Sequence, residues 1–279
     1  ALSGTGIAGL TIEGVTIGSG TDTPVNGIEL NNTTGAVTLT NVDITNTTGT
    51  GLSLNGAGGT VTGNNVDITG SNALSVNGGD AVVSFNATSS ITNTSGTAVS
   101  ITNRIGGSFT HFGSISSNGG TASGITISGA TAASNVTFGG QVSLGTTSAL
   151  GGSGVFINNN GQASDIAFTG GLEIETGGAP GFDVRNGGSI SVAAAGTRTI
   201  WTGGATAFFL QNTSIGSDGL NFDSIESVGS GPFSGIDVSS VDTSAGGISI
   251  GSATLSGSLS RAIDLENVTG ANGFSLTAA

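Results

Sequence analysis

The chain has 279 residues, including 53 glycines and 3 prolines, and its 17 acidic residues against 4 basic ones give a formal net charge of −13 at pH 7. This balance argues against nucleic acid and against an anionic membrane surface as partners, and no apolar run approaches the roughly 20 residues that span a bilayer. The absence of cysteine excludes a disulfide framework and a cysteine zinc site.

A motif of a small residue, an apolar residue, a variable residue and an apolar residue repeats along the chain, from Gly27-Ile28-Glu29-Leu30 to Ala262-Ile263-Asp264-Leu265. The first apolar residues of the ten copies are Ile28, Leu52, Leu74, Val99, Ile125, Val155, Phe182, Phe208, Ile236 and Ile263, at spacings of 22 to 30 residues. Such a period predicts a solenoid. The small residue is always glycine or alanine, which predicts a corner where a larger side chain would collide.

Two further alternating segments follow the motif in each period. The second segment contains Leu10, Val37, Val61, Val83, Phe109, Val136, Ile166, Ile190, Leu220, Ile248 and Phe274. The third contains Val15, Val42, Val66, Ile91, Ile115, Val142, Leu172, Ile200, Ile225 and Leu255. Alternation of apolar and polar residues is typical of strands, so three short strands make one turn.

The predicted fold is therefore all-β: a right-handed parallel β-helix of about ten turns that forms a single domain over residues 1–279. The drift in repeat length disfavours a left-handed hexapeptide solenoid. We expect the N-terminal half to have shorter turns, and the C-terminal half to have longer turns with more phenylalanine in its core, namely Phe109, Phe138, Phe168, Phe182, Phe208 and Phe222.

Asparagine recurs just after the first segment. The residues are Asn31, Asn55, Asn77, Asn103, Asn158, Asn186, Asn212 and Asn267. Because asparagine tolerates left-handed backbone angles and bonds to copies of itself on adjacent turns, these positions predict an asparagine ladder at one corner.

The outward residue of the first segment carries the best candidate for chemistry. This column ends in a candidate carbohydrate face formed by Phe156, Asp183, Phe209, Asp237 and Asp264. Asp237 and Asp264 should stand roughly 5 Å apart on adjacent turns, a separation that suits a retaining pair of carboxylates. The two phenylalanines either form a sugar-stacking patch or are covered by loops. Because most corners are short and Arg261 is the only nearby base, we expect no catalytic residues and no enzymatic activity.

Three other features favour structural roles. His111 is expected to face outward, and a lone histidine without cysteine makes a transition-metal site improbable. Trp201 is expected to pack at a corner. Oxygen ligands for calcium abound, but the Gly78-Gly79-Asp80 pattern is not repeated. We therefore expect neither a bound cofactor nor metal-ligating residues, with calcium as the only ion considered.

The ends of the predicted stack show neither a capping helix nor a charged edge, and open strand edges recruit other strands. Either the chain is part of a longer β-helix, or copies stack head to tail into a filament that rises roughly 48 Å per subunit. The residues expected to stack are Leu10, Ile12, Val15, Ile17, Ile28 and Leu30 at one end, and Leu255, Ile263, Leu265, Phe274 and Leu276 at the other.

The glycine-, asparagine-, serine- and threonine-rich turns, the repeated motif and the absence of cysteine resemble the passenger domains of bacterial autotransporters and filamentous-haemagglutinin-like adhesins. The resemblance implies export to the cell surface or the extracellular space and a non-enzymatic structural role as a filament, sheath or adhesin stalk. Its partners would be itself, neighbouring parts of a longer β-helix, surface glycans or a cell-surface protein. No translocator barrel or secretion domain is recognisable, so the export route stays open. The alternative function is a polysaccharide-binding or polysaccharide-cleaving β-helix.

Overall fold

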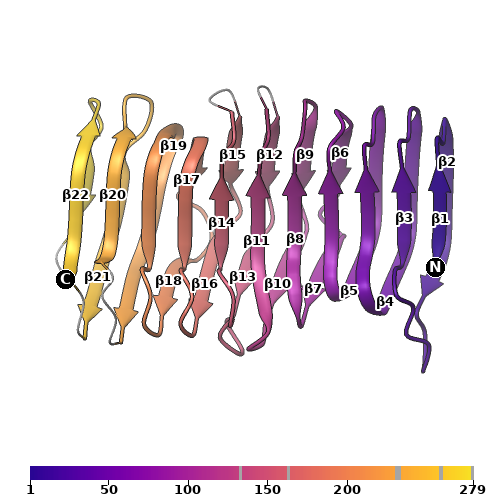
Figure 1. Ribbon diagram of the computed structural model, residues 1–279, viewed down its shortest axis with the longest axis horizontal. Helices are drawn as coiled ribbons and strands as arrows, with labels where there is room; N and C mark the ends of the chain where they lie inside the picture. The colour runs from indigo at the N-terminus through magenta and orange to yellow at the C-terminus, as the bar shows by residue number, and fades with distance from the viewer. Residues whose placement is uncertain (132–133, 162–163, 230–233, 258–259, 278–279) are drawn as a thin grey trace.

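The computed structural model describes residues 1–131, 134–161, 164–229, 234–257 and 260–277. These residues form no helix; they build one parallel β-solenoid of about ten turns. Figure 1 shows the turns following one another along the long axis, with the N-terminus at the indigo end and the C-terminus at the yellow end. The prediction of an all-β parallel solenoid is confirmed.

The strands differ in length because some run continuously through a corner. In the N-terminal half they are β1 (Leu2–Thr5), β2 (Gly9–Ile17), β3 (Ile28–Asn31), β4 (Ala36–Asn55), β5 (Thr60–Asn77), β6 (Val82–Phe85), β7 (Ser90–Asn93), β8 (Gly96–Thr102), β9 (Ser108–His111), β10 (Ser114–Ser117), β11 (Ala122–Ser128) and β12 (Asn135–Phe138). In the C-terminal half they are β13 (Val142–Leu144), β14 (Val155–Asn158), β15 (Asp165–Phe168), β16 (Leu172–Thr176), β17 (Phe182–Val192), β18 (Arg198–Thr202), β19 (Phe208–Val228), β20 (Ser234–Asp242), β21 (Ile248–Ser256), β22 (Arg261–Thr269) and β23 (Phe274–Leu276).

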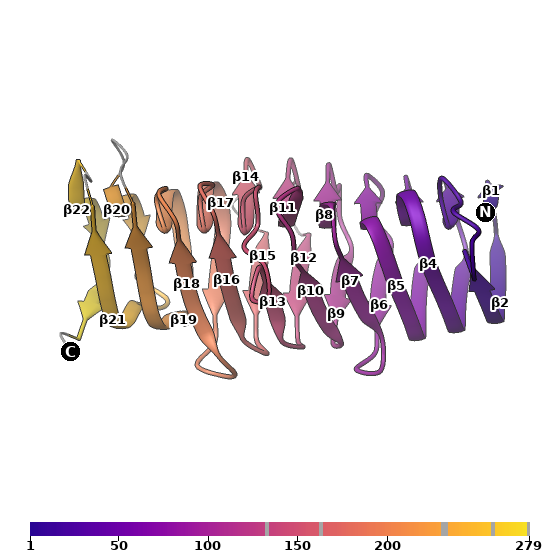
Figure 2. The same cartoon turned by 90° about the horizontal axis from the view of Figure 1, so that it is seen from below.

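Each turn contributes to three faces, named here for the three predicted segments. On the first face, all ten predicted positions pair in register from Ile28 to Ile263. The second face runs from Leu10 to Phe274 and the third from Val15 to Leu255. Figure 2 shows the same stack of turns from below.

The first face has one strand more than predicted, because β1 pairs with β3 in the register Leu2 with Ile28 and Gly4 with Leu30. Ile28 and Leu30 are therefore fully buried one turn inside the N-terminal end. Their expected place at the stacking edge was wrong. The motif search missed β1 because Leu2-Ser3-Gly4 has glycine where the other copies have a second apolar residue.

A row of aromatic rings fills the interior beneath the second face. Phe85, Phe109, Phe138 and Phe168 follow one another at centroid distances of 6.3, 5.8 and 4.9 Å, and the expected phenylalanines of the C-terminal half are all buried. Gly63 makes room at the start of the row, since a Cβ at this position would lie 2.2 Å from the Phe85 ring. Tilted and stacked rings at these distances pack more favourably than their buried area alone provides.

His111 lies in this row and not on the surface, so the expectation that it faces outward was wrong. Residues two apart on a strand point to the same side, and Phe109 points inward. His111 pairs with Phe85 and Phe138 on the adjacent turns and is 1% exposed. Its Nδ1–H donates a hydrogen bond to the carbonyl of Gly113 at 3.1 Å. Burial lowers the pKa of His111 to about 4 against the small opposing effect of this bond.

A column of left-handed residues marks the corner after the first face. Every turn has one, four positions beyond the first inward residue: Gly6, Asn32, Gly56, Gly78, Asn103, Gly129, Asn159, Asn186, Asn212, Ser240 and Asn267. Glycine and asparagine are the residues that adopt this conformation at little cost. The backbone conformation of this corner therefore explains why glycine or asparagine recurs at this position of the turn.

The predicted asparagine ladder occupies two adjacent positions and not one. Four of the eight asparagines are left-handed, whereas Asn31, Asn55, Asn77 and Asn158 lie one residue earlier at the end of the strand. The side-chain ladder is short. Asn77 donates to Asn55 at 3.3 Å, and Asn103 donates to Asn77 at 3.1 Å. Backbone angles thus account for more of this pattern than amide ladders do.

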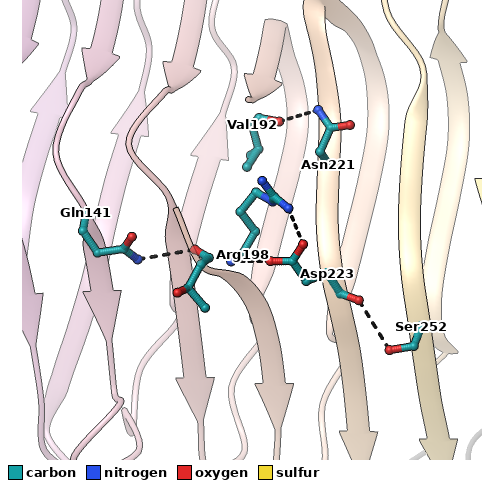
Figure 3. A network of polar contacts seen from close by, with 7 residues as sticks. Gln141, Val192, Arg198, Asn221, Asp223 and Ser252 are labelled. Carbon is teal, nitrogen blue, oxygen red and sulfur yellow. Dashed lines mark hydrogen bonds and ion pairs between the residues drawn. The ribbon is translucent and has the colours of Figure 1, made fainter. Parts of the chain in front are cut away.

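The corner between the second and third faces carries a polar network in the C-terminal half (Figure 3). Arg198 forms an ion pair with Asp223 on the next turn. Asn221 donates to the carbonyl of Val192 at 2.9 Å, and Ser252 donates to the carbonyl of Asp223 at 3.4 Å. These bonds join successive turns in addition to the strand ladders.

Across the described ranges there is no helix long and apolar enough to span a membrane.

The second face contains one irregularity at the pairing of β17 with β19. Ile190 pairs with Ile215, and Val192 pairs with Leu220. The sequence pattern instead aligns Ile190 with Leu220. Residues 216–219 form the inserted bulge, which includes the left-handed Gly219.

Candidate functional site

The outward column of the first face runs in strict register along the stack. In its C-terminal part, Phe156, Asp183, Phe209, Asp237 and Asp264 stand on five consecutive turns. Phe156, Asp183, Phe209 and Asp237 each lie between two buried residues of their own strand, because alternation sends every second side chain into the interior, whereas Asp264 lies on the end turn between the partly buried Ile263 and the exposed Leu265. The positions proposed as a carbohydrate face are therefore neighbours in space.

Four of these five residues line a groove of about 660 Å³, which we call the first-face groove. Asp183, Phe209, Asp237 and Asp264 lie along it together with the two arginines Arg185 and Arg261. Phe156 is one turn further toward the N-terminus and does not line it. The groove thus has a charged lining of both signs around a single phenylalanine ring.

Asp183 and Arg185 form an ion pair in the groove through two hydrogen bonds. The guanidinium Nε and Nη2 donate to the two carboxylate oxygens at 2.8 and 2.9 Å, and Asp183 is 3% exposed. The hydrogen bond to Asp183 is the largest cause that raises the pKa of Arg185. The Arg185 guanidinium carbon also lies 4.7 Å from the centre of the Phe209 ring. Phe209 is therefore covered on one face by this arginine.

Asp237 and Asp264 pair in register on adjacent strands, as their spacing predicted. Asp264 also forms an ion pair with Arg261. The pKa of Asp237 is raised, chiefly by burial and then by the neighbouring Asp264 carboxylate, while Arg261 opposes the shift. Two adjacent carboxyl groups, one of which has a raised pKa, form the kind of pair that acid–base catalysis uses.

Trp201 lies within β18, in the third segment as predicted, and not at the corner where it was expected to pack. It projects outward from the third face and is half-buried. Its register partners on the two adjacent turns are Glu175 and Glu226. The sequence analysis missed this cluster because it considered the outward-facing residues of the first segment only. The same alternation, applied to Leu172-Glu173-Ile174-Glu175, finds it.

The two ends of the stack expose interior residues. Leu2 is 41% exposed at one end and Leu265 is 46% exposed at the other. Seven of the predicted stacking residues are partly buried: Leu10, Val15, Ile17, Leu255, Ile263, Phe274 and Leu276. Ile12, Ile28 and Leu30 are buried. Equivalent positions one turn inside the C-terminal end, such as Ile236 and Ile248, are at most 1% exposed.

In the part of the chain that the structure describes, no three histidine, cysteine, aspartate or glutamate residues come together in a way that could hold a metal ion. The role of calcium therefore stays a prediction from composition alone. Comparison of the chain with protein-family models, with curated proteins and with solved structures finds no match. The likeness to autotransporter passengers is one of repeat style.

Proposed function

We propose that the chain is a non-enzymatic extracellular structural protein, a rod-like unit of a surface filament, sheath or adhesin stalk. The observation that carries this proposal is the exposure of interior residues at both ends of the stack, where Leu2 and Leu265 are more than 40% exposed while the core between them is closed. Further β-solenoid turns at either end, supplied by a second copy or by neighbouring parts of a longer polypeptide, would bury these residues.

The backbone supports such stacking because both ends have the same corner. Gly6 and Asn267 are both left-handed at the same position of the turn. A strand placed on the free edge of β22 would therefore meet the same backbone geometry that β1 offers to β3. Parallel pairing across such a junction repeats the ladder that already holds every internal turn.

The proposal is tested by the assembly state of the purified chain. Electron microscopy and sedimentation should show filaments with an axial repeat of roughly 53 Å, because the first face has eleven strands, the ten predicted ones and β1, at strand spacing. Leu265→Asp places a charge at the exposed end and should abolish them. Val82→Asp is the matched control, because Val82 is 48% exposed but lies on the side of the rod. A monodisperse monomer without fibres contradicts head-to-tail assembly.

The location outside the cell needs its own test. Antibody labelling of intact source cells should detect the chain, and external protease should remove it. Labelling that requires permeabilised cells would contradict the proposal. The absence of cysteine and the glycine-rich turns support an exported protein only through the resemblance to surface β-helices.

A second candidate function, binding or cleavage of a polysaccharide, is favoured by one observation, the raised pKa of Asp237 beside Asp264 in the first-face groove. Asp237 would protonate the leaving oxygen, and Asp264 would act on the other side of the glycosidic bond. The ion pair of Asp264 with Arg261 and the covering of Phe209 by Arg185 count against it. Release of reducing ends from a neutral polysaccharide, lost in Asp237→Asn, would establish cleavage.

A further inference from the structure

The outward face around Trp201 is hollowed into a separate site, which we call the Trp201 pocket. It measures about 470 Å³ and is lined by Glu175, Trp201 and Glu226 together with the small residues Ala149, Thr199 and Ser224. The register places Trp201 between the two glutamates, with one strand spacing of about 4.8 Å to each. An aromatic face thus lies between two carboxylates.

The strands beneath the pocket are fixed in place by core packing and a hydrogen bond. The inward residues next to the three pocket positions, Ile174, Ile200 and Ile225, are at most 1% exposed. Beyond Trp201, the buried Thr202 donates a hydrogen bond to the carbonyl of Ala205 at 2.9 Å. Since the strands cannot shift without opening the core, the indole and the carboxylates keep their relative positions, which reduces the entropy lost on binding.

Among the described residues, no arginine forms an ion pair with Glu175 or Glu226. The three ion pairs among the described residues use Asp183, Asp223 and Asp264. The fourth arginine, Arg104, is fully buried and donates to backbone carbonyls, including that of Gly78 at 3.2 Å. The chain contains no lysine, because its four basic residues are all arginine. A cationic partner for the Trp201 pocket would therefore come from another molecule.

We propose that the Trp201 pocket binds a primary alkylammonium group, the chemistry of a lysine side chain. The ammonium group lies over the indole face, which attracts cations through its ring quadrupole. Its N–H groups donate to the carboxylates of Glu175 and Glu226, and charge-assisted bonds of this kind are the stronger ones. The alkyl stem lies against the small residues of the rim. The pocket takes no part in the end stacking or in the first-face groove.

The test uses n-butylammonium as the probe and the chain's own fluorescence as the readout. The chain has one tryptophan and no tyrosine, so its near-ultraviolet emission reports on the pocket alone. A saturable change in emission is expected, and it should weaken as salt is added. n-Butanol, which has the same stem without charge, should give no saturable change. Tetramethylammonium should bind more weakly because it has no N–H to donate.

Variants separate the pocket from the overall negative charge. Glu175→Gln and Glu226→Gln should each weaken n-butylammonium binding about tenfold. Glu13→Gln, a change of the same charge on the exposed side of β2, should leave it unchanged. Unchanged circular dichroism shows that the variants are folded. The proposal is overturned if n-butylammonium gives no saturation, if all three variants bind alike, or if tetramethylammonium or the neutral sugar cellobiose binds more tightly.

Discussion

The Gln141 side chain donates a hydrogen bond from Nε2 to the carbonyl oxygen of Thr197 at 3.4 Å, although these residues belong to turns that are two apart (Figure 3). The turn between them has Gly171 at the crossing point, and a Cβ there would lie 2.2 Å from Gln141 Oε1 and 3.0 Å from the Thr197 oxygen. The Gln141 side chain therefore links two turns across the turn that lies between them. It can do so because residue 171 is glycine and has no side chain in this space.

Replacing Gly171 by alanine should break the hydrogen bond between Gln141 and Thr197. Gly171 also has a φ of +114°, so the new side chain meets both the steric clash and an unfavourable backbone conformation. We expect a loss of about 1–3 kcal/mol of unfolding free energy, measured by chemical denaturation. Gly178→Ala is the control, since nothing lies within 4 Å of a Cβ at that position. Equal stability of the two variants would contradict the role of the gap.

His111 should make the protein less stable in acid. Its folded pKa of about 4 lies below its ordinary value of 6.5, so between these pH values the unfolded chain binds a proton that the folded chain does not. Stability is therefore complete above pH 6.5 and falls by about 3 kcal/mol as the pH drops to 4. His111→Phe, which continues the aromatic row, should remove this part of the pH dependence. Parallel stability curves for the two proteins would contradict the prediction.

The pKa of Asp237 should respond in opposite directions to its two charged neighbours. Asp264→Asn removes the repulsion and should lower the pKa, although burial, the larger cause, keeps it above the ordinary value of 3.8. Arg261→Gln removes an attraction and should raise it further. Carbon-13 nuclear magnetic resonance of the side-chain carboxyl group measures both shifts. Shifts of the same sign in both variants would show that neither neighbour acts on Asp237 directly.

Ser240 is the one serine in the left-handed column, where it has a φ of 55° between Asn212 and Asn267 on the adjacent turns. Ser240→Asn should stabilise the protein by about 0.5–1 kcal/mol, because asparagine adopts this conformation at lower cost. The same change at Ser239, one position earlier, should have no such effect. Thermal or chemical unfolding of both variants decides the matter, and a larger gain at Ser239 would refute the explanation.

The periodic part of the fold was predictable from the sequence, since the ten motif copies pair one above another as their spacing indicates. The errors have local causes. β1 was missed because Gly4 breaks the apolar pattern, and His111 was misplaced by ignoring that residues two apart share a face. The groove residues were predictable as a column. The contact of Arg185 with Phe209 was not, because it depends on side-chain conformations that a repeat pattern does not encode.

The left-handed corner recurs at the same place in every turn, so each turn is nearly an interchangeable unit. Removing the residues from Leu52 to Ala73 would bring Leu74 directly beneath Ile28, in the place that Leu52 now holds. The shortened rod would lose about 4.8 Å of length and keep its cross-section. The number of turns determines the length of such a rod. Evolution can therefore change the length by duplicating or deleting turns without changing the packing of the interior.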